Sequence, residues 1–140
     1  MAITVIDPVT HPEKVGEAGK ILLHDSPNFH CWIYGPNAPG SEGPMHKHTA
    51  DQMYVCVKGQ ATFVFLDYPE QVLTPGMTVI IPAGEFYQID NRGAEESLLI
   101  GTRAESGTNG RKLKTTPWES LRPRFHSGLG DWVQKGLKRT

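Results

Sequence analysis

The sequence has little of several features that mark large protein classes. Only two cysteines, Cys31 and Cys56, occur in 140 residues, without a Cys-x-x-Cys spacing, so we expect free buried thiols rather than a disulfide framework or a zinc knuckle. The charge is nearly balanced, with 14 basic and 15 acidic residues, which gives no indication of a nucleic-acid or membrane partner. No apolar run has the length of a membrane span, and residues 1–14 lack the pattern of a signal peptide. The sequence therefore predicts a soluble, cytoplasmic protein.

Turn residues and short apolar runs dominate the first three quarters of the chain. Glycine and proline are plentiful, with 15 and 11 residues, which suits many short strands better than a helical bundle. Most of the runs are rich in β-branched and aromatic residues and end at turn residues. The predicted strands are residues 3–6, 21–23, 29–34, 51–58, 60–66, 71–73, 77–81, 86–90 and 97–102. This spacing predicts an all-β antiparallel sandwich or barrel.

The character of the chain changes after Ala104. We expect residues 1–104 to form one barrel with N-terminal edge strands, and residues 105–140 to form a C-terminal arm. Residues 115–120 resemble a helix start with a proline near the first turn. Trp118, Phe125 and Trp132 would anchor the arm on its own barrel or on a second subunit.

The most informative stretch is residues 40–59, which holds two histidines one residue apart. On a β-strand, His46 and His48 share a face, because side chains alternate with a period of two. Gln52 follows at the start of a strand whose alternation sets Gln52, Tyr54 and Cys56 on one face and Met53, Val55 and Val57 on the other. Two neutral imidazoles with an oxygen donor on one wall of a sheet indicate a metal site.

The same stretch resembles the first motif of the cupin superfamily, which is Gly, five residues, His-x-His, three or four residues, Glu, six residues, Gly. Here Gly40 is followed after five residues by His46 and His48, and Gln52 stands in the place of the glutamate, six residues before Gly59.

A second stretch resembles the second cupin motif, which is Gly, five residues, Pro-x-Gly, two residues, His, three residues, Asn. The matching residues are Gly76, Pro82, Gly84, Tyr87 in the place of the histidine, and Asn91. All spacings fit, and two of the four ligand positions are substituted.

The resemblance implies a jelly-roll barrel, also called a double-stranded β-helix. It also implies one divalent metal ion inside the barrel, carried over to His46, His48, Gln52 and Tyr87. Gln52 would be a neutral carbonyl ligand. Tyr87 binds a metal well only as phenolate, which requires its pKa to be brought down from about 10 by the cation. The ion would be Fe, Mn, Zn or Ni.

Each of these residues also has a simpler interpretation. The two histidines could lie in an exposed loop, Gln52 could be a hydrogen-bonding barrel residue, and Tyr87 could line the pocket without touching metal. Tyr54 could act as a proton donor, or it could be an ordinary aromatic residue of the hydrophobic core. His30, one strand earlier, could supply a further nitrogen if it faces inward.

The resulting hypothesis is a metal-dependent enzyme for a compact organic substrate, aromatic or oxygen-bearing. It is an oxygenase with Fe(II), or a lyase or isomerase with another ion, in which Tyr87 or Tyr54 acts as acid or base. The expected pocket wall is apolar and aromatic, drawn from Phe63, Phe65, Cys56, Ile89 and Leu98 or Leu99. The alternative is a non-catalytic, small-molecule-binding or regulatory barrel with a weakened or absent metal site. A homodimer is expected from the resemblance.

Overall fold

The structure is a computed structural model that describes residues 3–7, 20–106 and 113–114. All regular structure in these residues is β. The strands are β1 Lys20–Asp25, β2 His30–Asn37, β3 His46–Lys47, β4 Gln52–Lys58, β5 Ala61–Phe65, β6 Gln71–Leu73, β7 Thr78–Ile81, β8 Tyr87–Asp90, β9 Ser97–Arg103 and β10 Leu113–Lys114. Within the described part of the chain, no helix is long and apolar enough to cross a bilayer.

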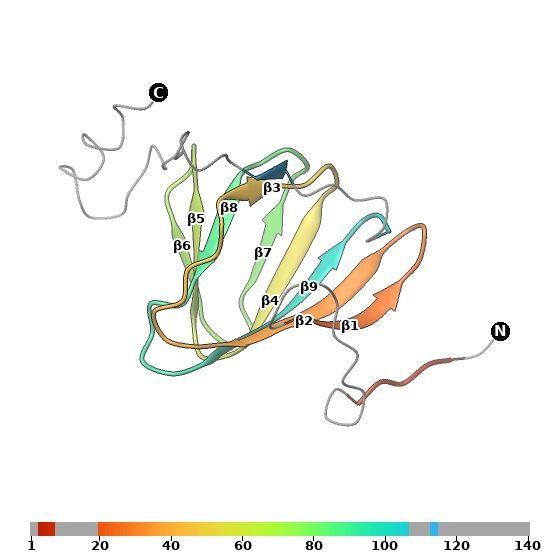
Figure 1. The fold of residues 1–140 in the computed structure, drawn as a ribbon, viewed down its shortest axis with the longest axis horizontal. Helices are drawn as coiled ribbons and strands as arrows, with labels where there is room; N and C mark the ends of the chain where they lie inside the picture. Colours follow the sequence, from red (N-terminus) through yellow and green to blue (C-terminus); the bar gives the residue numbers. More distant parts are fainter. Residues whose placement is uncertain (1–2, 8–19, 107–112, 115–140) are drawn as a thin grey trace.

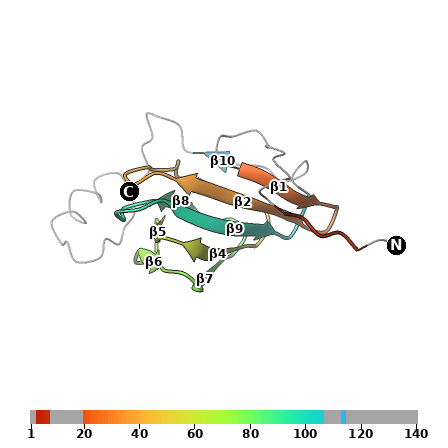
Figure 2. The ribbon, with the colours of Figure 1, turned by 90° about the horizontal axis from the view of Figure 1, so that it is seen from below.

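The strands form two antiparallel sheets of five, and Figures 1 and 2 show how these wrap around one interior. The first sheet, sheet A, has the order β1-β2-β9-β4-β7, and the second, sheet B, has the order β10-β3-β8-β5-β6. Strands far apart in the chain are neighbours, since β4 lies between β9 and β7, and β8 between β3 and β5. This arrangement confirms the predicted all-β jelly roll.

Side-chain alternation decides what lies inside. In β4, Gln52, Tyr54 and Cys56 are buried, whereas Met53 and Val57 on the opposite face are exposed, as the alternation predicts. The inner faces of the two sheets meet in one hydrophobic core, whose members are Trp32, Tyr54, Cys56, Ala61, Phe63, Phe65, Leu73, Ile81, Tyr87, Ile89 and Leu99. Burying a large apolar side chain of this kind stabilises a fold by roughly 1.5–3 kcal/mol, so this core is the main source of stability.

Two motif residues serve the backbone rather than the site. Gly59 has a φ of +70°, and a Cβ there would lie 2.3 Å from the Glu96 carbonyl oxygen, so only glycine fits the turn from β4 to β5. Asn91 is buried after β8; its amide nitrogen donates to the carbonyls of Asn37 and Glu95, and its oxygen accepts from the amide of Gly93. Both the nitrogen and the oxygen of this side-chain amide are thus hydrogen-bonded to backbone groups and fix the loops around it.

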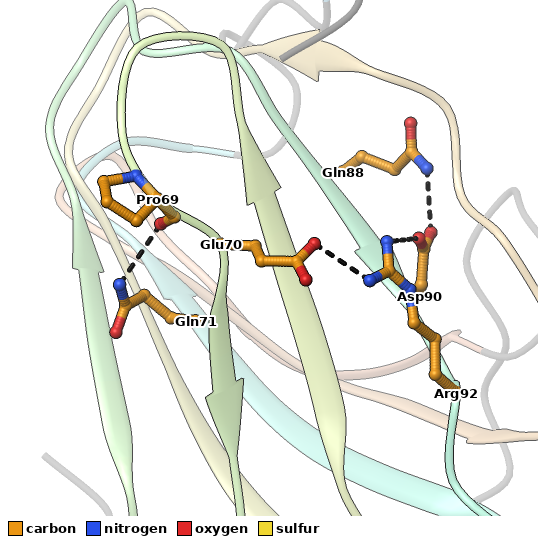
Figure 3. Close-up of polar contacts among 6 residues, drawn as sticks. All are labelled: Pro69, Glu70, Gln71, Gln88, Asp90 and Arg92. Atoms are coloured by element: carbon orange, nitrogen blue, oxygen red, sulfur yellow. Dashed lines mark hydrogen bonds and ion pairs between the residues drawn. The ribbon is translucent and has the colours of Figure 1, made fainter. Parts of the chain in front are cut away.

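A polar cluster ties the loop before β6 to the end of β8 (Figure 3). The Arg92 guanidinium lies 2.8 Å from a Glu70 carboxylate oxygen and 3.2 Å from an Asp90 carboxylate oxygen. The other Asp90 oxygen accepts from the side-chain amide of Gln88 at 2.9 Å. Since Asp90 is buried, these partners offset the cost of removing its charge from water.

The structure differs from the predicted strands at both ends of the chain. Residues 3–6 form no strand, and Ile3 and Val5 are 95% and 91% exposed. Among the described residues they pair with no strand of either sheet. β10 pairs with β3 and was not predicted, because a two-residue strand carries almost no periodicity. The predicted helical turn at 115–120 and most of the arm, including Trp118, Phe125 and Trp132, lie outside the described residues.

The end of β2 also differs from its prediction. The strand was expected to stop at residue 34, yet it continues through Gly35 and Pro36 to Asn37. Its pairing with β9 shifts register between Tyr34 and Asn37. Such an irregularity releases the ladder hydrogen bond that proline cannot make.

We predict that Gly101→Ala is strongly destabilising. A Cβ at this inward position of β9 would lie 2.5 Å from two atoms of the Trp32 ring and 2.8 Å from the Tyr54 ring. Overpacking of a filled core costs typically about 1–3 kcal/mol and occasionally more, so urea denaturation should show a loss at or above that range. Thr102→Ala, on the outer face of the same strand, is the matched control, and an equal loss in both variants would contradict the close packing.

Candidate metal centre

Both predicted imidazoles lie inside the barrel. His46 is in β3 and pairs in register with Tyr87 of β8, and His48 follows β3 directly. Their exposed fractions are 7% and 6%, which excludes the exposed-loop interpretation. The two ring centroids are 5.0 Å apart, and the His46 ring lies 4.4 Å from the Tyr87 ring. The structure therefore brings the two histidines and Tyr87 together.

The backbone sets the tautomer of His46. Its Nδ1 lies 2.8 Å from the carbonyl oxygen of Pro44. Because a carbonyl oxygen only accepts, Nδ1 must carry the proton, and in the neutral ring Nε2 then keeps its lone pair. A hydrogen bond of this kind is how metal-binding histidines are usually oriented.

The loop that carries His48 is anchored at three points. The amide of Gly84 donates to the His48 carbonyl at 2.9 Å. The amide of Ala83 donates to an Asp51 carboxylate oxygen at 2.8 Å, and the amide of Ala104 donates to the Asp51 carbonyl at 3.0 Å. Asp51, next to the position where the resemblance expects an acid, is therefore an exposed loop anchor rather than a replacement ligand.

Gln52 is the most constrained polar residue of the site. Its side chain is 3% exposed, and its Nε2 donates to the Tyr87 hydroxyl at 2.9 Å. Its Oε1 is buried, and no described residue hydrogen-bonds to it. A buried acceptor without a donor is unusual, because its desolvation is not offset. A carbonyl oxygen in this position is suited to a cation or to a ligand that donates a hydrogen bond.

The two tyrosines form a pair of neutral phenols behind Gln52. The hydroxyl oxygens of Tyr54 and Tyr87 are 3.3 Å apart. Burial raises the pKa of Tyr87 to about 12, although hydrogen bonds with Tyr54 and Gln52 act to lower it. Burial, followed by the proximity of Tyr87, raises the pKa of Tyr54 well above its ordinary value. Without a bound cation, both side chains are therefore hydrogen-bonding phenols and not phenolates.

No group of three or more His, Cys, Asp or Glu side chains that could hold a metal ion occurs in the described residues. The donor set of two imidazoles, an amide oxygen and a phenol therefore stays a prediction. His30 does face inward, yet its ring stacks on Trp32 at 4.9 Å and its Nδ1 lies 3.6 Å from an Asp25 carboxylate oxygen. Its partners are therefore not the histidine pair.

Next to the site lies a small cavity of about 20 Å³, lined by Lys20, Tyr34, Gly43, Pro44, His46, Tyr54 and Ile89. This is room for about one water molecule. Of the side chains predicted to form a pocket wall, Ile89 borders this cavity, whereas Phe63, Cys56 and Leu99 pack in the closed core. Phe65, also predicted to be part of the wall, lines a larger pocket of about 320 Å³ with Val79 and Ile81.

Sequence reasoning missed Arg103 and Trp32. Arg103 is the last residue of β9 and pairs in register with both His30 and Gln52. Its side chain is 5% exposed, and its Cζ lies 5.3 Å from the Trp32 ring centroid. The signal was present in the sequence, since Arg103 has the same strand parity as the buried Leu99. Counting along that strand would have placed a cation inside the barrel.

The raised phenol pKa values predict how stability depends on alkaline pH. Tyr87 contributes stability that is complete below pH 10 and is lost as pH rises toward about 12, because the unfolded chain loses the phenolic proton first. Two pKa units correspond to roughly 2–3 kcal/mol. The unfolding free energy of Tyr87→Phe should therefore fall less steeply than that of the wild type in urea titrations between these pH values. The exposed Tyr68→Phe is the control, and identical slopes for all three proteins would refute the assignment.

Comparison with known proteins places the fold. Residues 37–100 match the family model described as the cupin domain. Auxin-binding protein T92 of Nicotiana tabacum is 29% identical over 88 residues, which cover 56% of this chain and 46% of that relative. The matched region spans less than half the length of the curated relatives it resembles.

Two solved structures illustrate the likeness. One is a Klebsiella pneumoniae protein with a double-stranded β-helix domain, with a TM-score of 0.65 at 14% identity over 81% of this chain and 100% of that one. The other is a DMSP lyase from Ruegeria pomeroyi, with a TM-score of 0.56 at 20% identity over 66% of this chain and 45% of that one. At these identities the likeness shows the fold alone. Together with the family model, which matches residues 37–100, this likeness supports a cupin barrel fold for the chain.

Proposed function

We propose that this cupin barrel is a metal-dependent enzyme that promotes proton transfer, as a lyase or isomerase, on a compact oxygen-bearing molecule. His46, His48 and Gln52 would hold one divalent ion. The observation that carries the proposal is the buried Gln52 Oε1, an acceptor without a donor among the described residues. Gln52 faces the interior from sheet A and is hydrogen-bonded to Tyr87 of sheet B, the sheet whose strand β3 carries His46.

The chemistry of the donor set supports this proposal. Because Nδ1 of His46 donates to Pro44, the lone pair of the neutral ring is on Nε2, and the amide oxygen of Gln52 is a hard neutral donor. Since none of these ligands is charged, most of the positive charge would remain on the ion. A divalent ion bound there would act as a Lewis acid that polarises a substrate oxygen.

The two phenols supply the acid and base. Tyr87 is protonated at neutral pH because burial raises its pKa to about 12, so it can donate its proton to a strongly basic atom of a substrate. The oxygen left behind would accept hydrogen bonds from Gln52 Nε2 and from the Tyr54 hydroxyl. These groups stabilise the phenolate in the deprotonated state, and the phenolate regains its proton by taking one from another atom of the substrate, as an isomerisation requires.

A second candidate function is a non-catalytic binding barrel. One observation favours it, since the donor set contains no carboxylate. In the curated relatives that the chain resembles, the name states that auxin is bound. The same barrel could hold a small molecule without transforming it.

We also infer that two copies pair through the outer face of sheet A. Met53, Val57 and Ile80 lie on this face with exposed fractions of 36%, 44% and 63%, and exposed apolar patches usually mark interaction surfaces. Ile80→Lys should shift the wild-type dimer to a monomer in sedimentation velocity. Val72→Lys on sheet B is the matched control; a wild-type monomer, or an unchanged Ile80→Lys, would contradict the pairing.

Metal binding tests the central part of the proposal. Protein stripped with chelator and dialysed against Mn(II) or Zn(II) should bind about one equivalent by elemental analysis. His46→Ala and His48→Ala should each weaken binding at least tenfold, since each removes an imidazole, whereas His24→Ala at an exposed site should have no effect. Gln52→Glu should tighten binding because it adds a negative charge. Binding far below one equivalent, unchanged by His46→Ala, would support the binding barrel instead.

Catalysis is tested separately by incubating the metal-loaded protein with small enolisable and hydroxylated compounds in D₂O. Metal-dependent deuterium exchange or elimination, detected by NMR and lost in Tyr87→Phe, is expected. Oxygen uptake with the Fe(II)-loaded protein, unaffected by Tyr87→Phe, would instead indicate an oxygenase.

A further inference from the structure

We propose that Arg103 and Trp32 form the site that binds the carboxylate group of the molecule taken up by this barrel, so that its ligand is a compact organic acid. This inference rests on the proposed function for the identity of the site, and it adds the chemical class of the substrate.

Strand register places Arg103 in the interior. Gly101, two residues earlier in β9, faces inward, because a Cβ there would meet the rings of Trp32 and Tyr54. Arg103 therefore points to the same side. It stands opposite Gln52 in the pairing of β9 with β4, and opposite His30 in the pairing with β2. The guanidinium thus belongs to the same inner wall as the proposed amide ligand.

The charge of Arg103 is buried and lacks a counter-ion. Its side chain is 5% exposed, and no described carboxylate forms an ion pair with it. Its Nε is buried and has no hydrogen-bond partner among the described residues. Its Cζ lies 5.3 Å from the centroid of the Trp32 ring, a cation–π distance.

Trp32 adds a second donor to the same place. Its indole Nε1 is buried and also has no acceptor among the described residues. An indole N–H can only donate, so both of these groups require an acceptor. Lys20 adds positive charge, since its Nζ lies 5.3 Å from the same ring. Two buried donors of this wall, Arg103 Nε and Trp32 Nε1, thus lack an acceptor among the described residues.

A carboxylate satisfies these requirements better than a neutral ligand. It is planar, accepts through two oxygens and matches the donor geometry of guanidinium. The close packing around Trp32, whose ring a Cβ at Gly101 would meet at 2.5 Å, favours a short acid. Stacking of Arg103 on Trp32 as simple packing is the competing explanation, and it predicts no preference for anions.

The test compares two probes of nearly equal size, trifluoroacetate and trifluoroacetamide, by ¹⁹F NMR titration of the metal-free full-length protein. The wild type should bind the acid at least tenfold more tightly than the amide. Arg103→Met should abolish this preference, and Arg103→Lys should retain part of it. Arg92→Met, which removes the surface guanidinium of Figure 3, is the matched control and should bind like the wild type.

Equal affinity of the wild type for acid and amide would overturn the proposal, as would an acid preference that survives in Arg103→Met. If Arg103→Met does not fold, the proposal is still tested by the affinities of the wild type and of Arg103→Lys for the acid and the amide. The metal-free sample separates this proposal from the proposed function. A preference for the acid in a protein that binds no metal would contradict the proposed metal-dependent enzyme and support the carboxylate site. Metal binding without a preference for the acid would support the proposed enzyme and contradict the carboxylate site.

Discussion

The buried side chain of Gln52 is the constraint on which the site depends. One end of its amide donates to the Tyr87 hydroxyl, while the oxygen at the other end has no donor among the described residues. An amide removed from water is costly unless both ends are satisfied. This unsatisfied oxygen is buried in the same interior as two imidazoles and a phenol. We infer from the combination that the barrel interior binds a ligand in addition to packing the core.

The surrounding structure holds this arrangement in place. Backbone hydrogen bonds tie the loop of His48 to the turn before β8 and to the end of β9, and the Pro44 carbonyl orients His46. Below the site, the closed core leaves no room for water around Phe63 and Leu99. Charge is confined to one region of the inner wall, where Arg103 lies close to Trp32. Uncharged metal ligands would leave positive charge on a bound ion, and Arg103 adds a second positive charge inside the barrel. An anionic ligand would neutralise this charge.

Strand positions and the faces of β4 could be predicted from the sequence, because alternation in a half-buried strand is a local property. The two spaced motifs also identified the four candidate site residues. The closed core could not be predicted, since it depends on the separation of the two sheets and not on either strand alone. Residues 3–6 alternate like a strand but find no partner, and β10 is too short to leave a pattern. Arg103 was not predicted as a site residue because arginine is not a metal ligand. Its position in the strand, two and four residues from inward-facing residues, would nevertheless have placed it inside the barrel.

The central claim is that two imidazoles and the Gln52 oxygen converge on one cation. Pulsed EPR of the Mn(II)-loaded protein tests this most directly, because it detects nitrogen nuclei bound to the ion. The account predicts modulation from two histidine nitrogens in the wild type and from one in His48→Ala. Modulation from no histidine, or a two-nitrogen signal that persists in His48→Ala, would contradict it.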